Sequence, residues 1–181
     1  AKYGIEKIKT IGDAYMAAGG LPTPNTTHAT DVINAALEMR DFIAAGKARK
    51  VAAGLPYFEV RIGIHTGPVV AGIVGVKKFQ YDIWGDTVNT ASRMESSGEV
   101  GQVNISEATY RVVVGSPLSV GGLGDGSLTP GRSPGQADNR QRTTEGGQPT
   151  TDNGQRFTFT PRGKVQAKGK GEMEMYFVES V

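Results

Sequence analysis

Apolar and polar residues alternate in several short stretches of the chain, which is the pattern of strands that bury one face. Near the N-terminus, residues 5–11 and 14–18 flank a Gly-Asp pair, and this arrangement predicts a β-hairpin with a tight turn. Residues 58–65 alternate in the same way and predict a further strand. Residues 69–74 are almost continuously apolar, which predicts a central, buried strand.

Between about residues 27 and 50 the apolar positions recur with a period near 3.6, which predicts a long helix packed on a sheet. A short strand at 102–105 leads into a second predicted helix, which Ser106 can cap through its hydroxyl oxygen. Residues 157–167 and 173–178 predict two strands around a Lys-Gly-Lys-Gly turn, a second hairpin. Helices interspersed with hairpin-connected strands favour an α+β fold with helices over a mixed sheet.

One stretch, from Phe79 to Glu95, predicts a strand, a sharp turn and a helix in direct succession. Phe79, Tyr81 and Ile83 supply the alternation of the strand, and Gly85 permits the turn. Asp86 or Thr87 can cap the helix that follows.

The same stretch carries polar groups that suit a ligand. Asp82 lies at the end of the predicted strand, and Asn89 and Arg93 are four residues apart, so both point from one face of the helix. A carboxylate, an amide and a guanidinium so close together would serve an anionic ligand. Taken alone, the stretch fits a capped amphipathic helix with a solvated Arg equally well.

Residues 115–154 differ in kind from the rest of the chain. Ten of these residues are Gly and four are Pro, and none is aromatic or Ile. Such a composition cannot bury enough apolar surface to offset the entropy of ordering it. We therefore expect one domain over residues 1–181, interrupted by a disordered insertion.

Composition excludes several classes of function. A formal charge of +2 gives no strong attraction to nucleic acid, and the absence of Cys excludes disulfides, a thiol nucleophile and a Cys-based zinc site. No apolar run approaches the length of a membrane span, and the N-terminus has no signal-peptide core. The chain starts without Met, almost directly in a predicted strand, which indicates a piece of a longer protein.

Other candidate residues lie at turns. Asp13, at the tip of the first hairpin, offers an exposed carboxylate that suits Mg²⁺, although Gly-Asp turns are common without a metal. Lys168 and Lys170 flank Gly169, so ammonium groups and backbone amides converge where a phosphate could bind; a plain surface turn is the simpler interpretation. His65 is predicted to be a hydrogen-bonded residue at a strand end rather than a catalytic base.

Together, four motifs in this order resemble the catalytic domain of class III nucleotide cyclases. The resemblance covers roughly residues 1–113 and 156–181, and the insertion has no counterpart in the usual pattern. The motifs are Glu6–Met16, Arg61–Gly67, Tyr81–Glu95 and Lys168–Gly171.

The resemblance implies a fold and an activity. The expected fold is α+β, a mixed sheet related to the ferredoxin-like fold with helices packed on it and a C-terminal β-hairpin. Members of the family convert a nucleoside triphosphate into a 3′,5′-cyclic monophosphate and pyrophosphate, with two divalent metal ions, Mg²⁺ or Mn²⁺. Two domains pair head to tail, and the sites form at their interface.

The resemblance also implies that Lys9 and Asp82 read the base. An ammonium donates to a ring nitrogen of adenine, and a carboxylate accepts from its exocyclic amine. Guanine presents the reverse pattern, and guanylyl cyclases typically carry Glu and Cys at these two positions. The pair therefore points to ATP and to an adenylyl cyclase.

By the same resemblance, Asn89 orients the ribose, and Arg93 stabilises charge at the reacting phosphate. Lys168 holds the terminal phosphates, and Asp13 is one of two metal-binding aspartates. Because one chain carries all of these residues, we expect a homodimer. In each of its sites, Asp13 comes from one chain, and the other five residues come from the second chain: Lys9, Asp82, Asn89, Arg93 and Lys168. The family's second metal-binding Asp lies upstream of Lys9, on a first strand that this chain would lack together with its helix.

Three alternatives remain at this stage. The chain could be an inactive cyclase-fold module for regulation or dimerisation, or a guanylyl-specific cyclase. The third alternative, a relative of diguanylate cyclases, would need a Gly-Gly-Asp/Glu-Glu-Phe signature, which the sequence lacks. The expected partners are ATP and a second copy of the domain, with no nucleic acid, and with a membrane only through domains outside this chain. The expected location is cytoplasmic.

Overall fold

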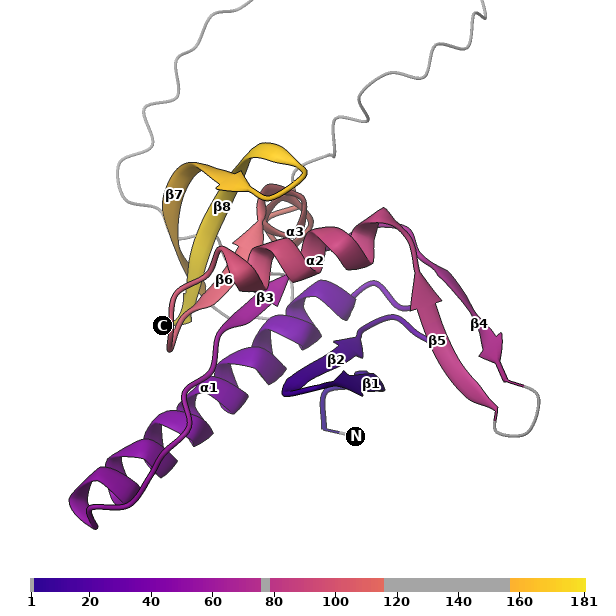
Figure 1. Cartoon of the computed structure of the whole chain (residues 1–181). Coiled ribbons are helices and arrows are strands. Elements are labelled where there is room, and N and C mark those ends of the chain that lie inside the picture. Colours follow the sequence, from indigo (N-terminus) through magenta and orange to yellow (C-terminus); the bar gives the residue numbers. More distant parts are fainter. Residues whose placement is uncertain (1, 76–78, 116–156) are drawn as a thin grey trace, which may run out of the picture.

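The computed structural model describes residues 2–75, 79–115 and 157–181. In these ranges the chain forms eight strands and three helices, arranged as an α+β fold (Figure 1). The predicted insertion at 115–154 lies almost entirely outside the described residues. The elements are β1 (Glu6–Ile11), β2 (Ala14–Ala18), α1 (His28–Ala52), β3 (Ile62–Ile64), β4 (Val70–Val74), β5 (Gln80–Trp84), α2 (Asp86–Ser96), β6 (Val103–Ser106), α3 (Glu107–Val113), β7 (Phe157–Ala167) and β8 (Gly171–Ser180).

A four-stranded mixed sheet in the order β3-β6-β8-β7 forms the centre of the fold. β3 runs parallel to β6, whereas β8 is antiparallel to both β6 and β7. The mixed sheet, the helices on it and the C-terminal β7–β8 hairpin confirm the fold class predicted from the sequence.

Both faces of this sheet are covered, because successive side chains of a strand point to opposite faces. Val103 and Ile105 of β6 join a core with the first half of α1 and with α3, where Ile33 is fully buried. Asn104, between them, faces the other way and donates from Nδ2 to the carbonyl of Met94 on α2 at 2.8 Å. Helix α2 thus lies on the face opposite α1.

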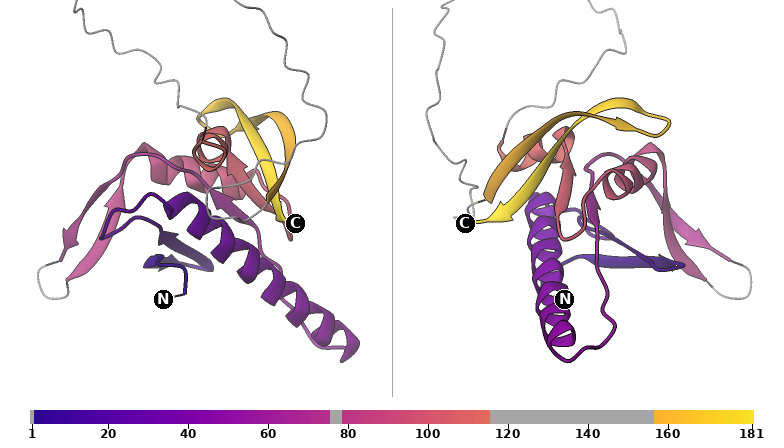
Figure 2. Two further views of the ribbon diagram at one scale, coloured as in Figure 1. Left: turned by 180° about the vertical axis from the view of Figure 1, so that it is seen from behind. Right: turned by 60° about the vertical axis from the view of Figure 1, so that its left-hand side comes forward.

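Two further hairpins stand apart from the central sheet. Among the described strands, β1 pairs with β2 alone and β4 pairs with β5 alone, each in an antiparallel register. The β4–β5 hairpin projects from the body as an arm, and the second half of α1 also extends beyond the core (Figures 1 and 2).

Two predicted strands need correction. The apolar run at 69–74 is not a central strand: β4 lies on the arm, and its Val70 and Ile73 are 68% and 71% exposed. The strand predicted over 58–65 is reduced to Ile62–Ile64, the residues of this stretch that pair with β6. Phe58 is instead exposed. None of the helices in the described ranges is long and apolar enough to cross a membrane.

Candidate functional site

The structure brings Lys9 and Asp82 together, although 73 residues separate them in the chain. β1 contacts β5, and Lys9 donates from Nζ to Oδ2 of the buried Asp82 at 2.7 Å. The other oxygen, Oδ1, accepts from the backbone amide of Ile83 at 2.8 Å. The hydrogen bond from Lys9 lowers the pKa of Asp82 below its ordinary value, so the carboxylate is charged at neutral pH.

Helix α2 begins immediately after β5, and Gly85 makes the connection. Gly85 occupies the N-cap position and has a φ of 128°, a backbone conformation that residues other than Gly rarely adopt. The predicted cap by Asp86 or Thr87 is therefore wrong, and no side chain caps this helix. The hydroxyl of Thr87 instead donates to the carbonyl of Pro68 at 2.6 Å, which fixes the first turn of α2 to the loop before β4.

One face of α2 carries the predicted catalytic residues. Asp86, Asn89 and Arg93 follow one another at intervals of three and four residues, so they share a face. Asn89 is exposed and Arg93 is partly exposed, so both groups remain accessible to a ligand. Thr90 and Met94 are the buried residues of this helix.

A close backbone contact fixes the distance of α2 from the sheet. A Cβ atom added at Gly63 of β3 would lie 1.9 Å from the amide nitrogen of Glu95 and 2.5 Å from the carbonyl carbon of Met94. Only Gly permits this approach. The packing that brings Asn89 and Arg93 to their place therefore depends on Gly63.

The Lys-Gly-Lys-Gly turn between β7 and β8 lies against the start of α2. Lys170 donates from Nζ to Oδ1 of Asp86, and its own backbone amide donates to the carbonyl of Ala167 at 2.9 Å. The hydrogen bond from Lys170 lowers the pKa of Asp86. Lys168, on the same turn, is exposed. The turn thus meets the face of α2 that carries Asn89 and Arg93.

Asp13 lies exposed at the tip of the β1–β2 hairpin. In the described ranges no hydrogen bond or ion pair joins Asp13 to the other five candidate residues, and no three His, Asp or Glu side chains lie together as a metal site. A free carboxylate fits one ligand of a Mg²⁺ ion that also binds substrate phosphates.

His65 is hydrogen-bonded, as predicted. Its Nδ1 lies 2.7 Å from the hydroxyl oxygen of Ser106, the residue that caps α3 by accepting from the amide of Thr109. Burial lowers the pKa of His65, and the nearby Lys170 lowers it further, against an opposing effect of Asp86. His65 consequently joins β3 to the start of α3 as a neutral side chain.

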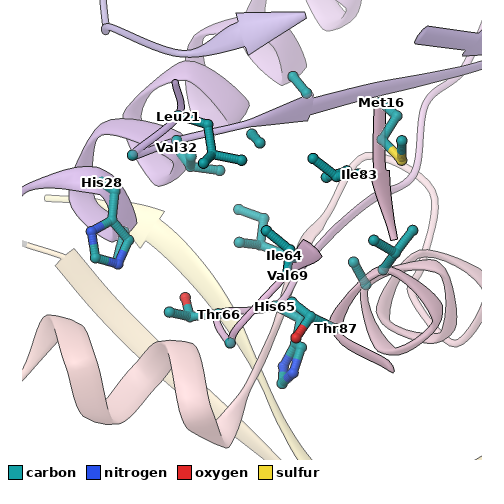
Figure 3. Close-up of a pocket in the computed structure, with 18 of the residues that line it drawn as sticks. Met16, Leu21, His28, Val32, Ile64, His65, Thr66, Val69, Ile83 and Thr87 are labelled. Atoms are coloured by element: carbon teal, nitrogen blue, oxygen red, sulfur yellow. The ribbon is translucent and has the colours of Figure 1, made fainter. Parts of the chain in front are cut away.

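A cavity of about 320 Å³ lies behind the site, between β2, the start of α1, β3 and α2 (Figure 3). Its walls are mostly apolar, and Met16, Val32, Ile64 and Ile83 point into it in Figure 3. None of the six candidate residues lines this cavity. The cavity lies between strands β2 and β3. Among the described strands, each of these two has a partner on one side only.

The structure thus joins Lys9 to Asp82, and it brings the turn that carries Lys168 to the start of α2, the helix that carries Asn89 and Arg93. In the described ranges, no hydrogen bond or ion pair links these two groups to each other or to Asp13. Sequence reasoning missed the pair formed by Asp86 and Lys170. The sequence places each of the two residues at a predicted turn, but no local pattern indicates a contact between residues that are 84 positions apart.

Comparison with known proteins gives one family. The family model for the adenylate and guanylate cyclase catalytic domain matches residues 1–132. The chain is similar to the human guanylate cyclase soluble subunit beta-2, with 37% identity over 176 residues, which cover 97% of the chain and 22% of that protein. It is also similar to the adenylate cyclase of Mycobacterium tuberculosis (strain ATCC 25618 / H37Rv), with 45% identity over 109 residues, which cover 60% of the chain and 24% of that protein. The chain therefore spans less than a quarter of the length of either relative.

Among solved structures, the guanylate cyclase domain of RhGC from Catenaria anguillulae, in complex with GTP, resembles the chain with a TM-score of 0.68. Its sequence identity is 31%, and the match covers 99% of the chain and 74% of that domain. Relatives named for both nucleotides are thus present.

Proposed function

Because the chain belongs to the adenylate and guanylate cyclase catalytic domain family, we propose that it is the catalytic domain of an adenylyl cyclase. The proposed reaction converts ATP into 3′,5′-cyclic AMP and pyrophosphate. The observation that carries the choice of ATP is the contact between Lys9 and Asp82, a donor and an acceptor held 2.7 Å apart in one partly buried position.

The choice between ATP and GTP follows from the hydrogen-bonding edges of the two bases. Adenine presents a ring nitrogen that accepts and an amine that donates, which matches an ammonium beside a carboxylate. Guanine presents a carbonyl that accepts and a ring N–H that donates, in the opposite sense. Relatives of both names match the chain, so a guanylyl-specific enzyme is the alternative, and the Lys9–Asp82 pair argues against it.

The remaining residues have proposed roles in the cyclisation. The 3′-hydroxyl oxygen of ATP forms a bond to the α-phosphorus, the bond from this phosphorus to the α–β bridging oxygen breaks so that pyrophosphate leaves, and the hydroxyl proton passes to solvent. Asn89 orients the ribose for in-line attack, and Arg93 stabilises the charge that develops on the α-phosphate oxygens. Lys168 neutralises the terminal phosphates that leave as pyrophosphate.

We propose Asp13 as a ligand of the catalytic metal ions, Mg²⁺ or Mn²⁺. Two such ions, when bound, supply charge that activates the 3′-hydroxyl and neutralises the triphosphate. The absence of a three-residue acidic cluster in the described ranges favours a site completed by other residues. The same observation supports the second candidate function, an inactive module of this fold.

A second copy of the chain is the proposed source of the missing groups. The β4–β5 arm presents exposed apolar side chains on both faces: Ile73 and Phe79, 71% and 77% exposed, share one face, and Val70 and Trp84, 68% and 40% exposed, share the other. Exposed apolar side chains on a projecting hairpin favour association. In a head-to-tail homodimer, Asp13 of one copy would serve a site whose other five residues come from the second copy.

We further propose that the full-length protein contributes a strand to the cavity between β2 and β3. Each of these two strands has one edge that pairs with no other described strand, and these edges and the apolar cavity walls suit a further strand. A single domain over residues 1–181 and a cytoplasmic location stay predictions.

Complementation tests the dimer and the roles together. Asp13→Asn and Arg93→Ala variants of the full-length protein should each form almost no cyclic AMP. Mixed in equal amounts, they should recover about a quarter of the wild-type activity, because half of the dimers are mixed and each mixed dimer holds one intact site. No recovery, with dimers present by light scattering, would assign both residues to the same side of the site and reject the proposed arrangement.

A further inference from the structure

The ion pair between Asp86 and Lys170 joins two segments that the proposed reaction uses separately. Lys170 comes from the turn that also carries Lys168, and Asp86 lies one turn of α2 before Asn89. The side chain of Lys170 is largely covered, with 24% of it exposed, whereas the side chain of Asp86 is 78% exposed. Lys170 therefore rests on α2, and Asp86 reaches out from the helix to hold it.

The position of this ion pair on α2 relates the β7–β8 turn to the proposed site. Asp86, Asn89 and Arg93 share one face of α2, so the β7–β8 turn is bound at the N-terminal end of the face where the ribose and the α-phosphate are proposed to lie. Gly169 and Gly171 have φ values of 76° and 74°, so the turn has a defined shape that only Gly adopts easily. Ala167, at the start of the turn, is buried in a cluster with Met94 of α2, and the ion pair of Lys170 adds a polar anchor at the tip of the turn.

We propose that Asp86 is a positioning residue, which holds Lys170 and thereby places Lys168 for the pyrophosphate part of the substrate before the nucleotide binds. The proposal rests on the proposed function, and adds a residue that itself does not touch the substrate. Its carboxylate would repel a triphosphate, so its presence beside an anion site calls for a compensating role. Ordering a flexible Lys side chain in advance is such a role, because the entropy of ordering is not lost on binding.

Charge alone and positioning predict opposite effects for the Asp86→Asn substitution. If only charge mattered, removal of a carboxylate beside the site would strengthen the binding of pyrophosphate. If Asp86 positions the turn, the same substitution weakens pyrophosphate binding, because Lys170 and Lys168 are no longer held.

The experiment measures pyrophosphate binding by calorimetry, and cyclase kinetics where the full-length protein is active. We expect Asp86→Asn to weaken pyrophosphate binding and raise KM about three- to tenfold, with kcat changed less than twofold. Asp86→Glu should recover most of the affinity. Asp86→Asn combined with Lys170→Gln should be no worse than Lys170→Gln alone, since the two residues act as one unit. Glu38→Gln removes a different exposed ion pair, between Lys2 near the N-terminus and Glu38 on α1, and serves as the matched control.

The outcomes separate this proposal from the proposed function. Tighter or unchanged pyrophosphate binding in Asp86→Asn would overturn the positioning role, as would additive effects of the two substitutions. A fall in kcat together with a lower melting temperature would mean that Asp86 only stabilises the fold, which also overturns it. Absence of cyclase activity in the wild-type protein would reject the proposed function, and the pyrophosphate measurements would still decide the role of Asp86.

Discussion

Gly63→Ala is the substitution whose effect on activity can be worked out most directly from the structure. The added Cβ would lie 1.9 Å from the amide nitrogen of Glu95, whereas ordinary contact begins at 3.4 Å. The obstacle is the backbone of α2, which cannot rotate away as a side chain would. The helix must therefore withdraw from β3 by about 1.5 Å, and it takes Asn89 and Arg93 with it.

The size of the effect follows from this displacement. A misplacement of about 1 Å in a catalytic group costs on the order of 100-fold in rate, so we expect kcat of Gly63→Ala to fall at least to about one hundredth of the wild-type value. Overpacking of this kind costs about 1–3 kcal/mol of stability. For a domain of this size, that corresponds to a melting temperature lower by roughly 2–12 °C.

The assay compares cyclic AMP formation and thermal unfolding in Gly63→Ala, Gly46→Ala and the wild type. Gly46 lies on α1 with no atom within 4 Å of an added Cβ, so its substitution introduces the same atom without a clash. This control should keep full activity, with a slightly higher melting temperature because Ala favours a helix by about 0.5–1 kcal/mol over Gly. Activity of Gly63→Ala within threefold of the wild type would refute the claim that this contact sets the place of α2.

Three other predictions concern the site. The double substitution Lys9→Glu and Asp82→Cys should shift the kcat/KM ratio of ATP to GTP by about 100-fold or more toward GTP, because two hydrogen-bonding positions, one buried and one partly buried, are mismatched; an unchanged ratio would remove both residues from base recognition. Asp13→Asn should lower activity on the order of 100-fold at saturating Mn²⁺ without a change in melting temperature, and near-normal activity would exclude it as a metal ligand. Burial lowers the pKa of His65, so the unfolded chain binds more protons at this residue once the pH falls below its ordinary pKa of about 6.5. The free energy of unfolding in urea should therefore decrease between pH 7 and pH 5 more in the wild type than in His65→Gln, and parallel curves would contradict this.

Local patterns predicted most of the helices and strands. The two hairpins at the ends of the chain and the long helix α1 follow from periodicity and turn residues, which depend only on neighbours in the sequence. The site was partly predictable for a different reason. Lys9 and Asp82 were joined through their resemblance to a family pattern, since no local signal connects residues 73 positions apart.

The errors have a common physical cause, because a strand pattern does not say which partner the strand finds. An apolar run such as Val70–Val74 looks the same in a buried central strand and on an exposed arm. The alternation that begins at Phe58 likewise continues beyond the three residues that pair with β6. The contact of Gly63 with α2 and the pair of Asp86 with Lys170 also depend on long-range packing, so they became visible only in the fold.

Competition between nucleotides tests the central claim most directly. The full-length protein is supplied with equal concentrations of ATP and GTP and with Mn²⁺, and the cyclic products are separated by chromatography. The Lys9–Asp82 contact predicts an excess of cyclic AMP of at least about tenfold over cyclic GMP. An equal yield or an excess of cyclic GMP would contradict the assignment as an adenylyl cyclase, and the absence of both products would favour the inactive module.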